Sequence, residues 1–372
     1  MVVKRVLHLS RDDKFTDIGI RSFEKVLPNC NDLYIYTQKP LKYIKSKNTI
    51  INNKKEISLK ILKTQFDCVV IHALDECWFK LIKEMPVNIP VIWIGWGYDY
   101  YDLLEFEGML PKTKEIYEVL NKKEYFKSIF DGWKKIRKNK IKKDIIERIN
   151  YFCPVLPDEY EIIKSSRNWS KFPQYIKFNY GSLEVDYLKG FMDGEIEGNN
   201  ILVGNSATPT NNHYEVFSLL SGIDFLSGKV MVPLSYGNDK YKKNIIGHGR
   251  YLFKENFEPL DVFMSINDYI KIIKSCKLVL MGHIRQQALG NIIIMIYLGA
   301  KVFLNPENPI YSYLKSQGIV VFNIYDFDQN ELNGRLSDDE VALNRLILSK
   351  YWSEMENVNR VKLLVKTVFG NF

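Results

Sequence analysis

The stretch KLVLMGHIRQQALGNIIIMIYLGAKVFLN, residues 277–305, contains the pattern that decides the fold of this chain. Its apolar runs at 277–281 and 301–305 have the composition of buried strands, and the run at 292–298 has that of a buried helix. Apolar strands that alternate with helices are typical of a parallel sheet covered on both faces. The polar residues from His283 to Gln287 then follow the carboxyl end of a strand, where such sheets bind their ligands.

Strand patterns of this kind occur in two series along the 372 residues. An irregular stretch at 152–200, rich in Pro, Gly and Asp, separates the series. The pattern predicts an α/β protein with two doubly wound, Rossmann-like domains that face each other across a cleft. We place these domains at residues 1–190 and 191–345, and expect a helical segment at 346–372 that packs back on the first domain. The expected strands are 6–10, 33–37, 68–74 and 91–97 in the first series, and 201–206, 229–235, 277–282, 301–305 and 319–324 in the second.

Composition and cysteine usage exclude several classes of protein. With 46% apolar residues the chain can bury two cores, which argues against intrinsic disorder. The five cysteines show no paired spacing, which argues against a disulfide framework or a zinc site. The first apolar run is too short for a signal peptide, and no window approaches the ~20 apolar residues of a membrane span. We therefore expect a cytoplasmic protein that can touch a membrane but not cross it.

The positive charge is concentrated in one segment. Of the formal net charge of +8, residues 112–148 alone contribute 13 − 6 = +7. Aromatic side chains alternate with these charges, and both kinds of side chain favour the headgroup region of a bilayer. A peripheral membrane surface is one interpretation, a solvated helix face is another, and a nucleic-acid surface is a third. The predicted membrane residues are Lys134, Lys135, Arg137, Lys138, Lys140, Lys142 and Lys143.

Three polar loops follow strands of the second series. Residues 204–215, GNSATPTNNHYE, run from a strand to a helix start, and their small, amide and hydroxyl side chains suit a phosphate or a sugar. The second loop runs from Ser235 to Gly237. In the third, Arg285 offers a fork of donors near a helix N-terminus, with Gln286 and Gln287 beside it. Each loop alone also fits a plain helix cap, but three at one sheet edge favour a ligand site.

The first series offers three candidates for proton transfer. Asp99 follows a strand in WIGWGYDYYD, residues 93–102, among aromatic side chains that would raise its pKa. Asp13 follows the first strand, and His72 lies near the end of the third. Each of them alone is more often a cap, a loop acid or a buried hydrogen-bonded histidine. All three nevertheless fall at the strand ends that we expect to face the cleft, and Asp99 is our choice for a general base.

Several sharper motifs are absent or incomplete. The sequence has no Walker loop, no HExxH and no complete GxGxxG, and the Gly204-Asn205-Ser206 run lacks the final glycine of a nucleophile elbow. Asp326 and Asp328 have the spacing of a DxD metal clamp, but they follow the last strand in a polar loop. We therefore expect neither a metal ion nor a cofactor.

Four motifs of the second series form a recognisable set. They are ILVGNS at 201–206 with Asn211 and His213, VPLSYG at 232–237, Arg285-Gln286-Gln287 with Gly290, and LNPENP at 304–309. Together they resemble the TDP-N-acetylfucosamine:lipid II N-acetylfucosaminyltransferases, glycosyltransferase family 56. The first series supports this resemblance more weakly, through His8, His72 and the segment from Trp96 to Asp99.

The resemblance implies a GT-B fold and a metal-independent, inverting hexosyltransferase. It implies transfer of Fuc4NAc or a related deoxysugar from a dTDP-sugar donor to a polyprenyl-diphosphate-linked saccharide acceptor. The setting would be assembly of enterobacterial common antigen, O-antigen or another surface polysaccharide at the cytoplasmic face of the inner membrane. The anionic membrane surface then becomes a more reasonable partner than nucleic acid. The donor-binding residues expected from the loops and the resemblance are Gly204, Asn205, Ser206, Asn211, His213, Ser235, Tyr236, Gly237, Arg285, Gln286, Gln287, Gly290, Asn305, Glu307 and Asn308.

Two rival functions remain open on the sequence. A nucleotide-sugar 2-epimerase of the same fold would convert the donor without any lipid acceptor. A basic RNA-binding or membrane-binding protein would have no catalytic activity. Specific binding of dTDP excludes the last of these.

Overall fold

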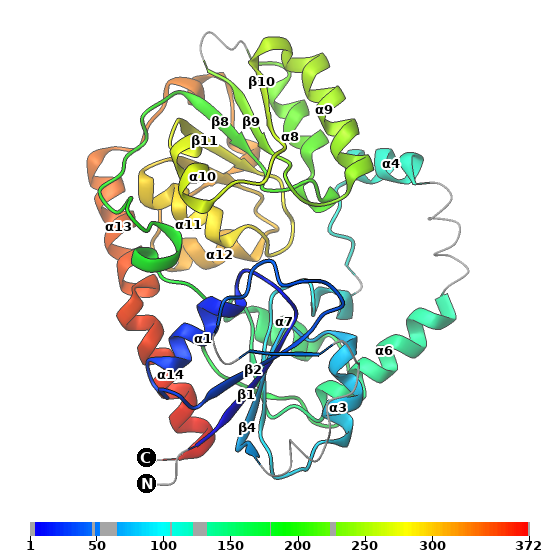
Figure 1. The fold of residues 1–372 in the computed structure, drawn as a ribbon. Coiled ribbons are helices and arrows are strands. Elements are labelled where there is room, and N and C mark those ends of the chain that lie inside the picture. The colour runs from blue at the N-terminus through cyan, green and yellow to red at the C-terminus, as the bar shows by residue number, and fades with distance from the viewer. Residues whose placement is uncertain are drawn as a thin grey trace. The chain divides into compact units, whose positions relative to one another are not determined.

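The computed structural model describes residues 4–46, 49–52, 65–104, 106–121, 132–178, 180–223 and 228–370. The chain forms two compact units, each built around one parallel sheet with helices packed on it (Figure 1). Unit 1 comprises Met1–Phe106, Asp131–Ser182 and Glu354–Phe372. Unit 2 comprises Glu107–Phe130 and Leu183–Ser353. The expected pair of α/β domains is therefore confirmed.

The sheet of unit 1 has the strand order β3-β2-β1-β4-β5-β6-β7, and all of its strand pairs are parallel. Every residue of the central strands β1, β4 and β5 is buried, which explains why these strands are apolar without alternation. The strands are β1 Val6–Ser10, β2 Asn31–Tyr36, β3 Thr49–Asn52, β4 Cys68–His72, β5 Val91–Ile94, β6 Tyr151–Cys153 and β7 Gln174–Tyr175.

Helices cover the sheet of unit 1 on both faces. One apolar cluster includes Trp93, Phe152 and Ile145. The second cluster joins Ile92 to Val361 and Leu364 of the C-terminal helix, so the end of the chain completes the core of the first unit. The helices of this unit are α1 Thr16–Glu24, α3 Phe79–Glu84, α6 Gly132–Ile146, α7 Glu159–Ser165 and α14 Glu354–Phe369.

The sheet of unit 2 has the order β10-β9-β8-β11-β12-β13 and is also parallel. Helix α11, Leu289–Leu298, is buried on every side from Ile292 onward and ends at Gly299, whose φ of 94° favours glycine. The strands are β8 Asn200–Val203, β9 Val230–Pro233, β10 Phe257–Leu260, β11 Cys276–Met281, β12 Lys301–Leu304 and β13 Phe322–Asn323. The other helices are α4 Pro111–Leu120, α8 His213–Leu220, α9 Asp239–Phe253, α10 Ile266–Ile273, α12 Pro309–Ser316 and α13 Asp338–Trp352.

The division of the chain differs from the one expected at residues 190 and 346. The stretch expected to be irregular contains β6, α7 and β7, and unit 1 continues to Ser182. Strands of three and two residues are too short to produce a periodic pattern. Helix α13 belongs to unit 2, and only α14 returns to unit 1. The edge strand β10, FEPL, was also missed because it contains proline and glutamate, which are both rare in strands.

A second difference concerns the segment that follows Phe106, which crosses into unit 2. The backbone N–H of Leu110 donates to Asn212 Oδ1 over 2.8 Å, and Thr113 Oγ1 donates to Glu215 Oε2 over 2.5 Å. Helix α4 therefore packs against α8, although the sequence places it among residues of the first unit. Of the helices in the described ranges, none is long and apolar enough to span a bilayer.

Candidate functional site

The loops that follow β8 and β11 are joined by the side chain of Asn211, which is fully buried. Its Oδ1 accepts from the backbone N–H of Asn205 over 2.7 Å and from His283 Nε2 over 2.9 Å. Its Nδ2 donates to Ser206 Oγ over 3.1 Å and to Thr208 Oγ1 over 2.8 Å. All four hydrogen-bonding positions of this amide are used, so it fixes both loops at the carboxyl edge of the sheet.

Asn205 extends this network to the loop after β9. Its Nδ2 donates to Tyr236 Oη over 3.0 Å, and its Oδ1 accepts from Gln287 Nε2 over 3.0 Å. The backbones of the same loops pair, because Ala207 N donates to Tyr236 O over 2.7 Å. Thr210 Oγ1 donates to Gln287 Oε1 over 2.7 Å and closes the ring of contacts. The three loops predicted to bind a donor therefore form one connected polar cluster, which we call the loop network.

Two glycines allow the close approach of these loops. Gly204 has a φ of 67°, and a Cβ there would lie 2.7 Å from Asn211 Oδ1 and 2.9 Å from His213 Nε2. Gly237 has a φ of 125°, and a Cβ there would lie 2.5 Å from the carbonyl carbon of Ala207. Any larger residue at either position would separate the loops.

His283 lies in the polar run that the sequence placed at this strand end, but it was not among the predicted donor-binding residues. Because a backbone N–H already donates to Asn211 Oδ1, that atom is an acceptor, and His283 must donate to it from Nε2. Burial, and then the positive charge of Arg285, hold the pKa of His283 well below its ordinary value, so the ring is neutral. Its Nδ1 is then a buried acceptor without a partner among the described residues. A lone histidine in a loop gives no sequence signal for this role.

His213 occupies a similar position at the start of α8. It is fully buried, and its Nδ1 lies 3.1 Å from Tyr241 Oη. Burial lowers the pKa of His213 to about 3, so this ring is also neutral. Its Nε2 faces Gly204 and has no partner among the described residues.

Two helices direct their N-termini to the loop network. Helix α8 starts after Asn212, with a φ of 53°, and α11 starts after Ala288, with a φ of 65°. Neither helix has a side-chain cap on its first N–H groups. Free backbone N–H groups and the positive end of the helix dipole both favour an anion at such a place.

Arg285 lies in the loop before α11 and is partly exposed. Its Nη1 donates to Gln286 O over 3.2 Å, and its aliphatic stem passes close to Gly108. Gln286 is buried, Gln287 belongs to the loop network, and Ser235 is partly exposed beside Tyr236. Gly290 differs from the expectation, because it packs against Tyr187 as part of α11.

The residues after β12 are mostly structural. Asn308 caps α12 through its Oδ1, which accepts from Ile310 N over 3.0 Å, and Asn305 Nδ2 donates to Tyr325 Oη over 3.0 Å. Both asparagines are buried, whereas Glu307 is exposed. Asp328 accepts from Asn330 N over 2.8 Å and caps a short helix. In the described ranges no group of three or more His, Cys, Asp or Glu side chains could hold a metal.

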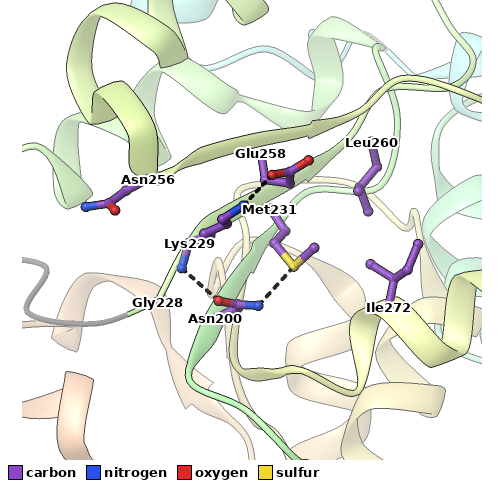
Figure 2. A pocket seen from close by; sticks show the side chains of 8 residues that line it. All are labelled: Asn200, Gly228, Lys229, Met231, Asn256, Glu258, Leu260 and Ile272. Atoms are coloured by element: carbon purple, nitrogen blue, oxygen red, sulfur yellow. Dashed lines mark hydrogen bonds and ion pairs between the residues drawn. The ribbon is translucent and has the colours of Figure 1, made fainter.

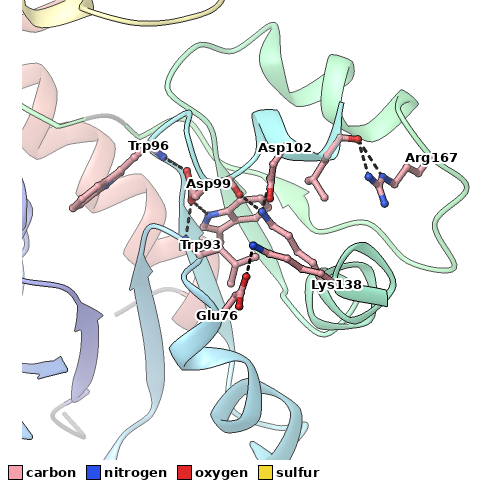
Figure 3. Close-up of polar contacts among 10 residues, drawn as sticks. Glu76, Trp93, Trp96, Asp99, Asp102, Lys138 and Arg167 are labelled. Carbon is pink, nitrogen blue, oxygen red and sulfur yellow. Dashed lines mark hydrogen bonds and ion pairs between the residues drawn. The ribbon is translucent and has the colours of Figure 1, made fainter. Parts of the chain in front are cut away.

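Asp99 lies beyond β5 as expected, and its carboxylate accepts three N–H groups of the protein. Its Oδ2 accepts from Leu74 N over 2.8 Å and from Trp93 Nε1 over 2.7 Å, and its Oδ1 accepts from Trp96 N over 2.7 Å (Figure 3). The residue is 3% exposed, and burial raises its pKa against the effect of these donors. Both oxygens are therefore committed to holding the ends of β4 and β5 together.

Asp13 remains available for proton transfer. It lies between β1 and α1, is partly buried, and accepts from Phe15 N through Oδ1 over 2.9 Å. No hydrogen bond to its other oxygen occurs within the described ranges. Burial raises the pKa of Asp13, as a general base requires. Its charge also acts on Tyr98 and Tyr180, which places all three residues at the same edge of unit 1.

His72, the third candidate, has no nitrogen free for a substrate. Its Nε2 lies 2.9 Å from His8 Nδ1, and its Nδ1 is bonded to Tyr180 Oη. Asn31 Nδ2 donates to Glu24 and to Leu27 O, so Asn31 Oδ1 accepts from His8 Nε2 over 3.1 Å. Both rings are neutral because burial lowers their pKa values. The hydrogen bonds between these side chains therefore all run in the same direction: the phenol of Tyr180 donates to His72, His72 donates to His8, and His8 donates to Asn31.

The basic segment is less exposed than its composition suggested. Lys142 is buried, and its Nζ donates to Asp99 O over 2.7 Å and to Asp102 Oδ1 over 2.5 Å, which excludes it from a membrane surface. Lys138 pairs with Glu76 (Figure 3), and Lys143 pairs with Glu147 over 2.6 Å. Arg137 and Lys140 are exposed. The side chains of Lys134 and Lys135 lie outside the described residues.

A pocket of about 650 Å³ lies in unit 2 away from the loop network. It is lined by Asn200 and Lys229 at the amino ends of β8 and β9, and by Glu258, Leu260 and Ile272 (Figure 2). Lys229 Nζ pairs with Glu258 over 2.7 Å, and Asn200 Oδ1 accepts from Lys229 N over 2.8 Å. The polar groups that line this pocket are therefore largely occupied with one another.

Comparison with known proteins identifies the second unit. Residues 188–340 match the family described as 4-alpha-L-fucosyltransferase glycosyl transferase group 56. The matched segment contains every residue of the expected donor site. The match confirms the family resemblance and the expectation of a glycosyltransferase.

Solved structures of similar fold cover the whole chain. HepE of Anabaena in complex with UDP and glucose is 10% identical, with 98% of this chain and 100% of that chain covered and a TM-score of 0.63. A glycosyltransferase from Rickettsia africae is 11% identical, with 100% of each chain covered and a TM-score of 0.62. Sucrose-phosphate synthase from Thermosynechococcus elongatus is 10% identical, with coverage of 98% and 96% and a TM-score of 0.58. At these identities the likeness concerns the fold, which is GT-B.

Proposed function

We propose that this glycosyltransferase moves Fuc4NAc or a related deoxysugar, with inversion, from a dTDP-sugar to a polyprenyl-diphosphate-linked glycan in surface polysaccharide assembly. The observation that carries the proposal is the family match over residues 188–340, which encloses the entire loop network. The structure of HepE contains UDP and glucose, the two parts of a nucleotide sugar. A nucleotide-sugar donor therefore suits both comparisons, and the deoxysugar and the lipid acceptor follow from the family.

The donor diphosphate would bind at the carboxyl edge of β8, β9 and β11. The uncapped N-termini of α8 and α11 and the guanidinium of Arg285 supply positive potential there. The hydroxyls of Ser206 and Thr208 bond to each other, so one of their two protons remains for a neutral hydrogen bond to the donor. Both N–H groups of Gln287 already donate within the loop network and hold the loops in place. Protein groups alone would thus balance about two negative charges, so we propose that binding needs no divalent ion.

The acceptor hydroxyl needs a base, and we assign this role to Asp13. Its second carboxylate oxygen lacks a protein partner in the described ranges, and burial raises its pKa. Asp99 then acts as a positioning residue that fixes the backbone of Trp96. His72 fixes the phenol of Tyr180, whose proton is donated to His72. An inverting transfer requires only one such base, since the sugar leaves its diphosphate as the acceptor oxygen attacks.

A lipid-linked acceptor requires the enzyme to act at a bilayer surface. We propose a peripheral position at the cytoplasmic face of the inner membrane, held by basic groups that attract anionic headgroups. Ion pairs already neutralise part of the positive charge of α6, so this helix offers less charge for such a contact than its sequence suggested.

Transfer can be tested with purified protein, dTDP-Fuc4NAc and a polyprenyl-diphosphate disaccharide, with mass spectrometry of the products. We expect a product that carries one added deoxysugar, no product with UDP-glucose, and unchanged donor when the acceptor is omitted. Conversion of the donor without an acceptor would instead establish an epimerase. Failure of dTDP to bind would contradict the donor site as a whole.

A further inference from the structure

The exposed face of α9 carries a row of cations that the proposed reaction does not use. Lys240, Lys243 and Arg250 are exposed on this helix, and Lys254 is exposed directly after it. At 100° per residue, the three helical cations fall within an arc of about 80°. The four cations together extend over about 21 Å. The opposite face is buried through Tyr241, Ile245, Gly249 and Phe253.

These four cations have no carboxylate partner within the described ranges. This is the reverse of α6, in which Lys138, Lys142 and Lys143 each pair with an acidic side chain. The only acidic residues between 239 and 255 are Asp239 and Glu255, one at each end of the row. Five Lys or Arg side chains in the same range give 5 − 2 = +3.

The middle of this row of cations is exposed to solvent, and exposed apolar side chains lie near it. Gly247 lies on the same face, and a Cβ there would meet no atom within 4 Å. Tyr251, on this face, is 79% exposed. Lys242 Nζ donates to Asp261 O over 2.8 Å, which joins the first turns of α9 to the loop that carries Val262 and Phe263. Those two side chains are 69% and 53% exposed, which is unusual for adjacent apolar residues in water.

We propose that the exposed face of α9, together with the loop at Val262 and Phe263, is the docking surface of unit 2 for a bilayer of anionic phospholipids. The inference rests on the proposed lipid-linked acceptor for its choice of partner. Cations above the headgroups gain Coulomb energy from every anionic lipid within a Debye length. Tyrosine favours the interface, and the apolar loop side chains gain by entering the acyl boundary.

A flat bilayer suits this surface better than RNA. A straight helix face can lie along a plane over its full length, whereas a nucleic-acid site commonly combines a basic groove with several stacking aromatics. Only Tyr251 is aromatic on the exposed face of α9. Val262 and Phe263 would gain nothing from phosphate, but would gain from lipid.

Vesicle sedimentation tests the inference directly. The full-length protein is mixed with vesicles of phosphatidylglycerol and phosphatidylethanolamine, with phosphatidylcholine vesicles as the neutral control. The variant K240Q/K243Q/R250Q/K254Q should bind the anionic vesicles roughly a hundredfold more weakly. A charge-conserving variant, K240R/K243R/R250K/K254R, should bind like the parent. Phe263→Ser should also weaken binding to the anionic vesicles, and its effect relative to the parent should be largest at high salt, where the Coulomb contribution is screened.

A matched control removes the same charge elsewhere in unit 2. Lys189, Lys271, Lys315 and Lys350 are exposed on separate elements, so K189Q/K271Q/K315Q/K350Q should retain most of the binding. If both quadruple variants lose vesicle binding equally, the inference is overturned, because net charge alone then explains the binding. Loss confined to R137Q/K140Q on α6 would also overturn it, as would a 30-nucleotide RNA that binds more tightly than the vesicles.

The same variants separate this inference from the proposed reaction. Transfer to a detergent-dispersed acceptor should remain within twofold of the parent in K240Q/K243Q/R250Q/K254Q, because these residues lie outside the loop network. If the parent binds anionic vesicles through α9 but transfers no sugar, the docking surface stands and the proposed function fails. If the parent transfers sugar but the α9 variant binds anionic vesicles as tightly as the parent, the proposed function stands and the docking surface fails.

Discussion

His283 Nε2 lies 2.9 Å from Asn211 Oδ1, and this hydrogen bond fastens the loop after β11 to the loop after β8. The two residues are separated by 72 positions in the chain. Because Asn211 also accepts from Asn205 N, removing its amide would leave this buried donor without its partner and would leave His283 Nε2 with only Asn205 Oδ1, at 3.2 Å. Asn211 is therefore a central buried side chain of the network that holds the loops of the candidate donor site.

Replacing Asn211 with Leu should weaken both the fold and the donor site. The side-chain volume is nearly kept while every hydrogen bond of the amide is lost, so we expect the free energy of unfolding to fall by about 1–3 kcal/mol. The affinity for dTDP should fall at least tenfold, measured by calorimetry. The exposed Asn330→Leu in the same unit serves as the control and should change neither quantity. Unchanged dTDP affinity in a folded Asn211→Leu protein would separate the loop network from the donor.

Replacing Arg285 with Ala should weaken donor binding and transfer together, by about 2–4 kcal/mol, if its guanidinium binds the diphosphate. Arg335→Ala is a suitable control, because Arg335 is exposed in the same unit and, among the described residues, donates to Gly198 O and Asn199 Oδ1 alone. Activity of the parent should survive a chelator, since protein groups meet the charge of the diphosphate. Strict dependence on magnesium or manganese would contradict this account.

The exchange of Asp13 for Asn should lower turnover by roughly a hundredfold or more while dTDP affinity is kept. Burial raises the pKa of Asp13 above its ordinary 3.8, so the parent should gain activity as rising pH removes this proton. The variant should lose that acidic limb of the pH profile. Near-normal turnover of Asp13→Asn would remove it as the base.

Asp99→Asn should act on stability instead. An amide nitrogen would face one of the N–H groups that now donate to the carboxylate, which should lower the free energy of unfolding by about 2–4 kcal/mol. Any fall in turnover should be no larger than the fall in the fraction of folded protein, measured by circular dichroism. A stable Asp99→Asn protein without turnover would restore Asp99 as the base.

The buried His8 predicts how stability depends on pH. Its folded pKa is about 4 and its ordinary value is 6.5, so the unfolded chain binds the proton first as pH falls. The free energy of unfolding should therefore decrease below about pH 6.5, by about 2 kcal/mol at pH 5 from this residue alone. Urea unfolding of the parent and of His8→Asn at pH 7.5 and 5 should show a smaller pH effect in the variant. Equal slopes would mean that the pKa of His8 is the same in the folded and unfolded chains.

Lys142→Met distinguishes a structural lysine from a membrane lysine. The ammonium now binds Asp99 O and Asp102, so its loss should lower the free energy of unfolding by about 1–3 kcal/mol. Binding to anionic vesicles should not change, because the side chain is 4% exposed. The exposed Lys140→Met should leave stability within about 0.5 kcal/mol. A stable Lys142→Met protein that releases vesicles would contradict the buried placement.

The central strands and the polar loops were predictable because their signals are local. Strands buried on both faces need continuous apolar runs, and the polar residues that follow them stand out from that background. The sequence therefore located the loops after β8, β9 and β11. It also supplied Arg285 and the family motifs, which lie in one segment and keep their order.

The roles of Asp99, His72 and Lys142 were not predictable, because each depends on partners from other elements. Asp99 has the same neighbours in sequence whether its carboxylate faces solvent or accepts three N–H groups, and only the approach of Leu74 and Trp93 decides between them. His72 is committed by His8 and Tyr180, 64 and 108 positions away. The same reasoning applies to α4, which is assigned to unit 2 by Asn212 and Glu215.

By itself the sequence determined that this chain forms two parallel α/β sheets and that polar groups lie at the carboxyl ends of particular strands, since hydrophobic burial acts on local patterns. Only the tertiary structure decided which of those polar groups are already bonded. A polar residue has the same local sequence whether its side chain is bonded or free. The free energy of burying that side chain is set by hydrogen-bond partners from distant positions in the chain. Among the residues that the structure describes, that difference left one oxygen of Asp13 without a hydrogen-bond donor. It also left the cations of the α9 row without carboxylate partners, whereas Lys138, Lys142 and Lys143 of α6 are paired.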